Sequence, residues 1–192
     1  VPVMIIPAGK LTISGPSGTG FSPLVRTFPP AVLENFNQNE TRIFIERKLG
    51  QVGIKIKDTE FNKIYRITEG HPFVLSAYMN AAYSRLQPGE PELNETHLNA
   101  TDVDFVNRVL APFFSRFFDQ AGKKSKIILS KMAQKSNGEI TIAVLSEELK
   151  KGYNELSPNL AKLVQDGAIL RVERGKYRLF HHLLGAYING KH

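Results

Sequence analysis

The chain has 192 residues, 42% of them hydrophobic, and a mean hydropathy of −0.20, values typical of a globular protein with one or two domains. The absence of cysteine excludes disulfides, thiolate metal sites and cysteine nucleophiles, and no apolar run approaches the roughly 20 residues of a membrane helix. The net charge of +7 is uneven. Residues 1–104 hold 10 basic and 11 acidic residues, whereas residues 105–192 hold 15 and 7. This asymmetry suggests that the second half meets either a polyanion or an acidic protein face.

The first 36 residues contain one predicted strand and a glycine-rich loop. The apolar run Val3–Ile6 is consistent with a buried strand of a parallel sheet. The spacing within Gly15–Ser22 imitates a P-loop, but Phe21 stands where the phosphate-binding lysine is required. Pro23 and the pair Pro29–Pro30 prevent a useful helix from following. We interpret the segment as a Gly/Ser loop, with a decayed P-loop as the alternative.

Three helices are predicted in the next part of the chain. They are expected at residues 37–49, 58–69 and 72–86. Asn37 and Glu40 resemble a capping box at the start of the first helix. The second helix stops at Gly70 and the third begins at Pro72, so the two meet in a tight corner. We expect this corner to direct the free N–H groups of the third helix at one point in space.

A loop at Pro88–Pro91 is a plausible subdomain boundary, and Thr101 is expected to cap the next helix. Four residues of that helix form an apolar stripe that we assign to the core: Phe105, Val109, Phe113 and Phe117. Further elements follow at residues 126–134 (helix), 138–142 (strand), 145–150 (helix), 157–166 (helix) and 180–188 (helix).

The helix at 157–166 and the hairpin after it are the most informative stretch. Ser157 can cap this helix with Pro158 in its first turn, and Gly167 supplies a left-handed stop. One face is expected to be apolar: Leu160, Ala161, Leu163 and Val164. Two β-prone runs, Ala168–Glu173 and Lys176–Leu179, then form a hairpin. This order predicts a winged helix-turn-helix. The fold class is therefore mainly α, a helical bundle followed by a winged helix-turn-helix domain with a small β-hairpin.

Two motifs together resemble the C-terminal part of STAND-type AAA+ ATPases, which are widespread as uncharacterised archaeal ATPases. Ile67–Leu75 resembles the G-x-P motif of that family, and Leu160–Gly167 followed by Gly175–Leu179 resembles its winged helix. The resemblance runs in order along nearly the whole chain. It implies a remnant of the nucleotide-binding domain at residues 1–36, a helical lid at 37–100 and a winged helix at 101–192.

The family's proline packs on adenine, so the resemblance implies a nucleotide contact for Pro72, with Gly70 and His71 beside it. Walker A and Walker B precede this point in the family, and the residues before Asn37 cannot form a nucleotide-binding sheet. We therefore expect a fragment that is not an enzyme, with ATP or ADP bound in a complete parent protein and no cofactor in this chain alone. The expected partner is the parent's nucleotide-binding domain, in the cytoplasm and without a membrane.

DNA binding is an open alternative, either within this architecture or in a stand-alone winged-helix transcriptional regulator. A winged helix reads DNA with its third helix in the major groove and its wing on the backbone. The candidate residues on the helix and wing are Asn159, Lys162, Gln165, Arg171, Arg174, Lys176 and Arg178. The helix lacks an arginine to read guanine, and Asp166 and Glu173 oppose phosphate contact.

No metal site and no catalytic constellation are predicted. The histidines show no i, i+4 pairing with a carboxylate that would suggest zinc. His181 and His182 are expected at the start of the last helix, and a metal there is the less favoured interpretation.

Overall fold

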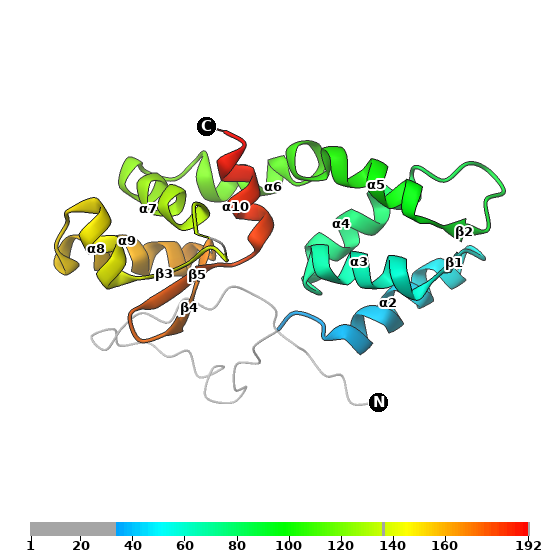
Figure 1. Cartoon of the computed structure of the whole chain (residues 1–192), viewed down its shortest axis with the longest axis horizontal. Coiled ribbons are helices and arrows are strands. Elements are labelled where there is room, and N and C mark those ends of the chain that lie inside the picture. The colour runs from blue at the N-terminus through cyan, green and yellow to red at the C-terminus, as the bar shows by residue number, and fades with distance from the viewer. Residues whose placement is uncertain (1–33, 136, 192) are drawn as a thin grey trace, which may run out of the picture. The chain divides into compact units, whose positions relative to one another are not determined.

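The computed structural model describes residues 34–135 and 137–191, and it is mainly helical with small β-sheets, which confirms the coarse fold class (Figure 1). The expected strand at Val3–Ile6 and the glycine-rich loop lie outside the described residues. Glu34–His192 form one compact unit with a continuous hydrophobic core. Within the described ranges, no helix is long and apolar enough to cross a membrane.

The helices of the first part begin where local signals place them, but the third ends at Tyr83, before the predicted end at Leu86. They are α2 (Gln38–Gly50), α3 (Asp58–Thr68) and α4 (Pro72–Tyr83). The predicted capping box is confirmed, because the Asn37 side chain accepts from the Glu40 backbone N–H while the Glu40 carboxylate accepts from the Asn37 N–H. Side chains spaced four residues apart on α2, Thr41, Ile45 and Leu49, are buried.

A short parallel pairing closes this helical part and was not predicted. Strand β1 (Lys55–Ile56) pairs with β2 (Glu92–Leu93), in the register Lys55 with Glu92 and Ile56 with Leu93. The pairing joins the segment before α3 to the segment after α4. The two strands of two residues each are too short to carry a recognisable alternation in sequence.

The helix expected to be capped by Thr101 begins about two turns earlier. Asn94 caps α5 (Glu95–Asp104), accepting from the backbone N–H groups of Thr96 and His97, and Thr101 is buried inside the helix. The prediction of a Thr101 cap is therefore wrong. The expected boundary between residues 100 and 101 falls inside α5 and does not coincide with a break between elements.

The predicted apolar stripe of this region is displaced by one residue. A π-helical segment, η1 (Phe105–Val109), follows α5, and the Leu110 N–H donates to the Phe105 carbonyl oxygen five residues back. Because the turn is wider, Leu110 lies on the same helix face as Phe105, where a regular α-helix would place Val109. The buried stripe, continued by α6 (Ala111–Phe118), is Phe105, Leu110, Phe114 and Phe118. Val109 is 36% exposed, whereas Phe113 and Phe117 are half-buried and pack against the core, so the predicted stripe is wrong at Val109 and correct in part at the two phenylalanines.

The remaining elements follow the predicted order. They are α7 (Lys123–Ala133), β3 (Glu139–Thr141), α8 (Ile142–Leu149), α9 (Tyr153–Asp166), β4 (Ile169–Glu173), β5 (Lys176–Leu179) and α10 (His182–Asn189). The strands form one antiparallel sheet in the order β3-β5-β4 (Figure 1). The register of β4 against β5 shifts between Arg171 and Glu173, which marks a bulge on β4. The predicted hairpin is therefore present, and its neighbour β3 pairs with β5.

Helix α9 starts earlier than predicted. Gly152, not Ser157, precedes its first residue, and Pro158 lies inside the helix. In a helix interior a proline removes the hydrogen bond to the residue four positions back, here Asn154, and its ring crowds that carbonyl, at a cost of about 3 kcal/mol. Burial of Leu156, one turn before Leu160, contributes about 2 kcal/mol and offsets much of that cost.

The buried face of α9 is also narrower than expected. Leu156, Leu160 and Leu163 are buried at the i, i+4, i+7 spacing, whereas Ala161 and Val164 are exposed. The predicted left-handed stop is confirmed, because Gly167 has a φ of 78° and its N–H bonds back to the last turn.

Candidate functional site

The corner between α3 and α4 is built from two consecutive residues in the left-handed region. Glu69 has a φ of 48° and Gly70 a φ of 65°. A Cβ atom on Gly70 would lie 1.9 Å from the Phe36 carbonyl oxygen, so glycine is required by space as well as by backbone conformation. The Phe36 N–H in turn donates to the Gly70 carbonyl oxygen at 2.9 Å. The segment leading into α2 is therefore held directly against the corner.

The start of α4 is partly closed by its own cap. His71 is the N-cap residue, and its Nδ1 accepts from the Val74 N–H at 3.4 Å. The expected convergence of free N–H groups at Pro72 therefore loses one donor to the His71 ring. Pro72 itself is exposed, and burial lowers the pKa of His71 below its ordinary value. A neutral His71 is consistent with its role as an acceptor.

A histidine from the far end of the chain binds the other side of this corner. His181 is the N-cap residue of α10, which confirms the predicted location at a helix start, and its side chain is completely buried. Its Nε2 contacts the Thr68 carbonyl oxygen at 3.0 Å, and its Nδ1 accepts from the Leu183 N–H at 3.2 Å. Because a carbonyl oxygen only accepts, Nε2 carries the ring proton. Burial lowers the pKa of His181 to about 4.

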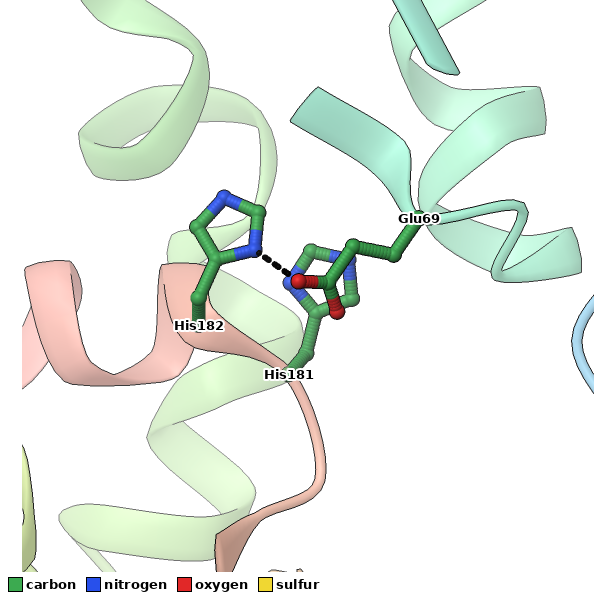
Figure 2. Close-up of side chains that lie close together, drawn as sticks. All are labelled: Glu69, His181 and His182. Carbon is green, nitrogen blue, oxygen red and sulfur yellow. Dashed lines mark hydrogen bonds and ion pairs between the residues drawn. The ribbon is translucent and has the colours of Figure 1, made fainter. Parts of the chain in front are cut away.

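The next residue, His182, contacts the same corner through a carboxylate. Its Nδ1 lies 2.9 Å from Glu69 Oε1, as the dashed line in Figure 2 shows. The hydrogen bond from His182 lowers the pKa of Glu69. One ligand-type atom each of Glu69, His181 and His182 lie within 4.8 Å of one another. Sequence spacing could not find this group, because Glu69 precedes His182 by 113 residues.

Aromatic rings fill the space beside the histidines. Phe73 at the start of α4 lies 4.3 Å from Phe113 of α6, measured between ring centroids. Phe180, which precedes His181, lies 4.9 Å from Phe117 and 5.7 Å from the His71 ring. The start of α4, helix α6 and the segment between β5 and α10 are thus packed together by aromatic contacts.

The residues proposed for DNA contact divide into two groups. Lys162 and Gln165 on α9 and Arg171 and Arg174 near the hairpin turn are exposed. Lys176, by contrast, forms ion pairs with Glu139 and Glu173, and Arg178 is half-buried. Asn159 donates from its side chain to the Glu155 carbonyl oxygen of its own helix. Among the residues that the structure describes, the first group is therefore the better candidate for contact with a partner.

The same region also exposes apolar side chains. Val164 on α9 is 36% exposed, and Leu170 and Val172 on β4 are 40% and 49% exposed. The carboxylates of Asp166 and Glu173 are exposed as well. Near the four exposed candidate residues the surface is therefore a mixture of apolar, basic and acidic groups.

Much of the basic excess of the second half lies elsewhere. Lys131 of α7 and Lys135, which follows that helix, pair with Glu148, and Lys124 of α7 pairs with Glu155. These ion pairs join α7 to α8 and α9. The lysines in them are paired within the chain, although the sequence alone suggested that they could meet a partner.

Comparison with known proteins gives one family match. Residues 111–188, from α6 to α10, match the model of a domain of unknown function, DUF8462. A search of curated proteins finds no match for the chain. The likeness to DUF8462 covers the part of the chain that contains the three-stranded sheet and His181–His182.

Proposed function

We propose that residues 101–192 form a winged helix-turn-helix and that residues 37–100 form the helical lid of a STAND-type AAA+ ATPase in the cytoplasm. The order α7-β3-α8-α9-β4-β5 supports the first part, because it places three helices and a β-hairpin in the winged-helix sequence. The G-x-P resemblance at Gly70–Pro72 supports the second.

The proposed role is to couple the nucleotide state of the parent to the position of the winged helix. The observation that carries it is the double contact of the corner. On one side Gly70 is bonded to Phe36, which leads back toward the residues upstream. On the other side Thr68 is bonded to His181. A nucleotide touching Pro72 would therefore press on a corner that α10 contacts directly.

This proposal has a simple first test. The gene that encodes the chain should also encode a GKS/T loop and an acidic Walker B strand before Val1, because the lid requires a nucleotide domain to close on. Their absence from the gene would reject the ATPase assignment.

The coupling has a second, independent test in the complete ATPase. Hydrogen exchange at the amides of α10 and the β4–β5 hairpin is compared with ATP and with ADP bound. We expect the rates of amide exchange to differ between the two states. The contact between Thr68 and His181 should be required for this difference. Identical exchange in both states would reject the coupling even if the ATPase assignment holds.

Direct DNA binding is the second candidate function. It is supported by the exposure of Lys162, Gln165, Arg171 and Arg174 on one helix and one hairpin. Exposed Val164 and Leu170, together with the nearby carboxylates, favour contact with a protein instead, since a DNA-binding surface is expected to be more strongly basic. We therefore rank packing against the parent's nucleotide domain above DNA binding.

Mobility shift on a nonspecific duplex distinguishes the two. If three cations meet phosphates, affinity should fall roughly 40-fold between 50 and 200 mM salt. The double variant Arg171→Glu/Arg174→Glu should then lose the shift. A matched control, Arg47→Glu/Lys48→Glu, reverses two exposed cations at the end of α2 and should leave it unchanged. No retardation at either salt concentration would remove DNA binding.

A further inference from the structure

The group formed by Glu69, His181 and His182 has the donor set of a transition-metal site. Two imidazoles and one carboxylate are ligands that Zn²⁺ accepts in proteins, often with a water in the remaining position. The three residues come from the corner after α3 and from the start of α10, and Figure 2 shows the Glu69 carboxylate beside both rings. Their ligand-type atoms lie within 4.8 Å of one another.

We infer that Glu69, His181 and His182 bind a divalent transition-metal ion, with Zn²⁺ as the probe, and that the ion fastens the α3–α4 corner to α10. The site does not depend on the proposed ATPase function. Ligands of a tetrahedral zinc ion are separated by about 3.3 Å, given bonds of about 2.0–2.1 Å. His182 Nδ1 and Glu69 Oε1, at 2.9 Å, are already close to that spacing.

The third ligand is oriented by an outer-shell hydrogen bond. Histidines that bind metals usually donate their other ring N–H to a carbonyl or carboxylate, which fixes the tautomer. His181 makes this bond from Nε2 to the Thr68 carbonyl oxygen. The bond leaves Nδ1 as the nitrogen with a free electron pair, and that nitrogen is the proposed ligand.

Metal binding requires a small rearrangement at His181. The two imidazole planes are inclined by 27° with centroids 4.7 Å apart, so His181 must turn for both rings to share one ion. The electron pair of Nδ1 then leaves the Leu183 N–H, and the proton between His182 and Glu69 is displaced. One neutral hydrogen bond is weak compared with the zinc–ligand bonds that replace it.

This rearrangement supplies a readout that adventitious zinc would not give. On addition of Zn²⁺ to the full chain, the Leu183 amide should shift in a ¹⁵N-correlated spectrum and exchange faster with solvent, because it loses its acceptor. Calorimetry should give one zinc ion per chain at micromolar free zinc. Thermal unfolding should move to higher temperature with zinc and return after chelation, because the ion binds the folded state.

Variants assign the ligands without removing the buried ring. His182→Ala and Glu69→Gln, both at exposed positions, should each weaken zinc binding by more than about 100-fold, beyond the 10–100-fold typical of an outer-shell loss. The matched control is Glu90→Gln. Glu90 forms an ion pair with His97, and no second histidine takes part in that pair. Its zinc affinity should equal that of the unmodified chain.

Three outcomes would overturn the site. In the first, the chain does not bind zinc at micromolar free zinc. In the second, the unmodified chain and both ligand variants bind zinc equally well, and in the third, zinc binds but the signal of the Leu183 amide is unchanged. The second outcome would identify adventitious surface binding only.

Discussion

His181 donates a hydrogen bond from Nε2 to the Thr68 carbonyl oxygen, and this bond joins residues 113 positions apart. The same ring accepts from the Leu183 N–H and so caps α10. One buried side chain therefore both starts the last helix and attaches it to the end of α3. The stability of this junction is open to direct measurement.

Replacing His181 with alanine should destabilise the fold by about 2–4 kcal/mol, because it removes two hydrogen bonds and leaves a cavity in a buried site. His181→Asn should cost less, since asparagine is a good N-cap and can still accept from the Leu183 N–H. Urea unfolding of the two variants measures the difference. Equal losses would mean that the cap contributes little.

Gly70→Ala should destabilise the protein by about 2 kcal/mol or more. The new Cβ would meet the Phe36 carbonyl oxygen, and alanine would also occupy the left-handed region. Gly167→Ala is the matched control, because Gly167 has a similar φ of 78° but open space around its Cβ position. We expect it to cost only about 1 kcal/mol. Chemical denaturation of both variants separates the steric contribution from the conformational one.

The displaced stripe around η1 predicts opposite outcomes for two adjacent residues. Leu110→Ala should cost about 2–5 kcal/mol, since Leu110 is fully buried. Val109→Ala should cost well under 1 kcal/mol, because Val109 is partly exposed. If thermal denaturation showed the larger loss at Val109, the π-helical register would be wrong.

Asp119 should contribute to acid sensitivity. Hydrogen bonds from Tyr187 and Lys191 lower its pKa below the ordinary value of an aspartate in the folded state. Its stabilising contribution is therefore present above its unfolded pKa and is lost as the pH falls through the lowered folded value. Asp119→Asn should flatten the acid limb of a stability–pH curve below about pH 4 and leave its shape near neutrality unchanged. An acid limb of unchanged slope would contradict this assignment.

Local signals were sufficient for the helix ends that depend on neighbours in sequence. The box at Asn37 and Glu40 and the stop at Gly167 were predicted because each is decided within a few residues. The order of helices and strands after residue 120 was predicted for the same reason. The start of α9 was missed, since the proline was placed in the first turn, whereas the helix begins earlier and buries Leu156 in the core.

The candidate site was predicted only in part. Sequence identified the corner residues and placed His181 and His182 at a helix start, but their contacts with Thr68 and Glu69 depend on the packing of α10. The π-helical turn at η1 depends likewise on which side chain the core accepts. These contacts and this helix register depend on residues far apart in the sequence, so the periodicity of a single sequence cannot predict them.

The bulge on β4 has a consequence for the behaviour of the protein at high concentration. In the described sheet β4 is a terminal strand, and strands in that position can recruit a strand from another molecule. The irregular register between Arg171 and Glu173, flanked by exposed charges, interrupts the row of backbone groups that such recruitment would need. Although Leu170 and Val172 are exposed on β4, the backbone of this strand is therefore poorly suited to pair with a strand of a second molecule in amyloid-like stacking.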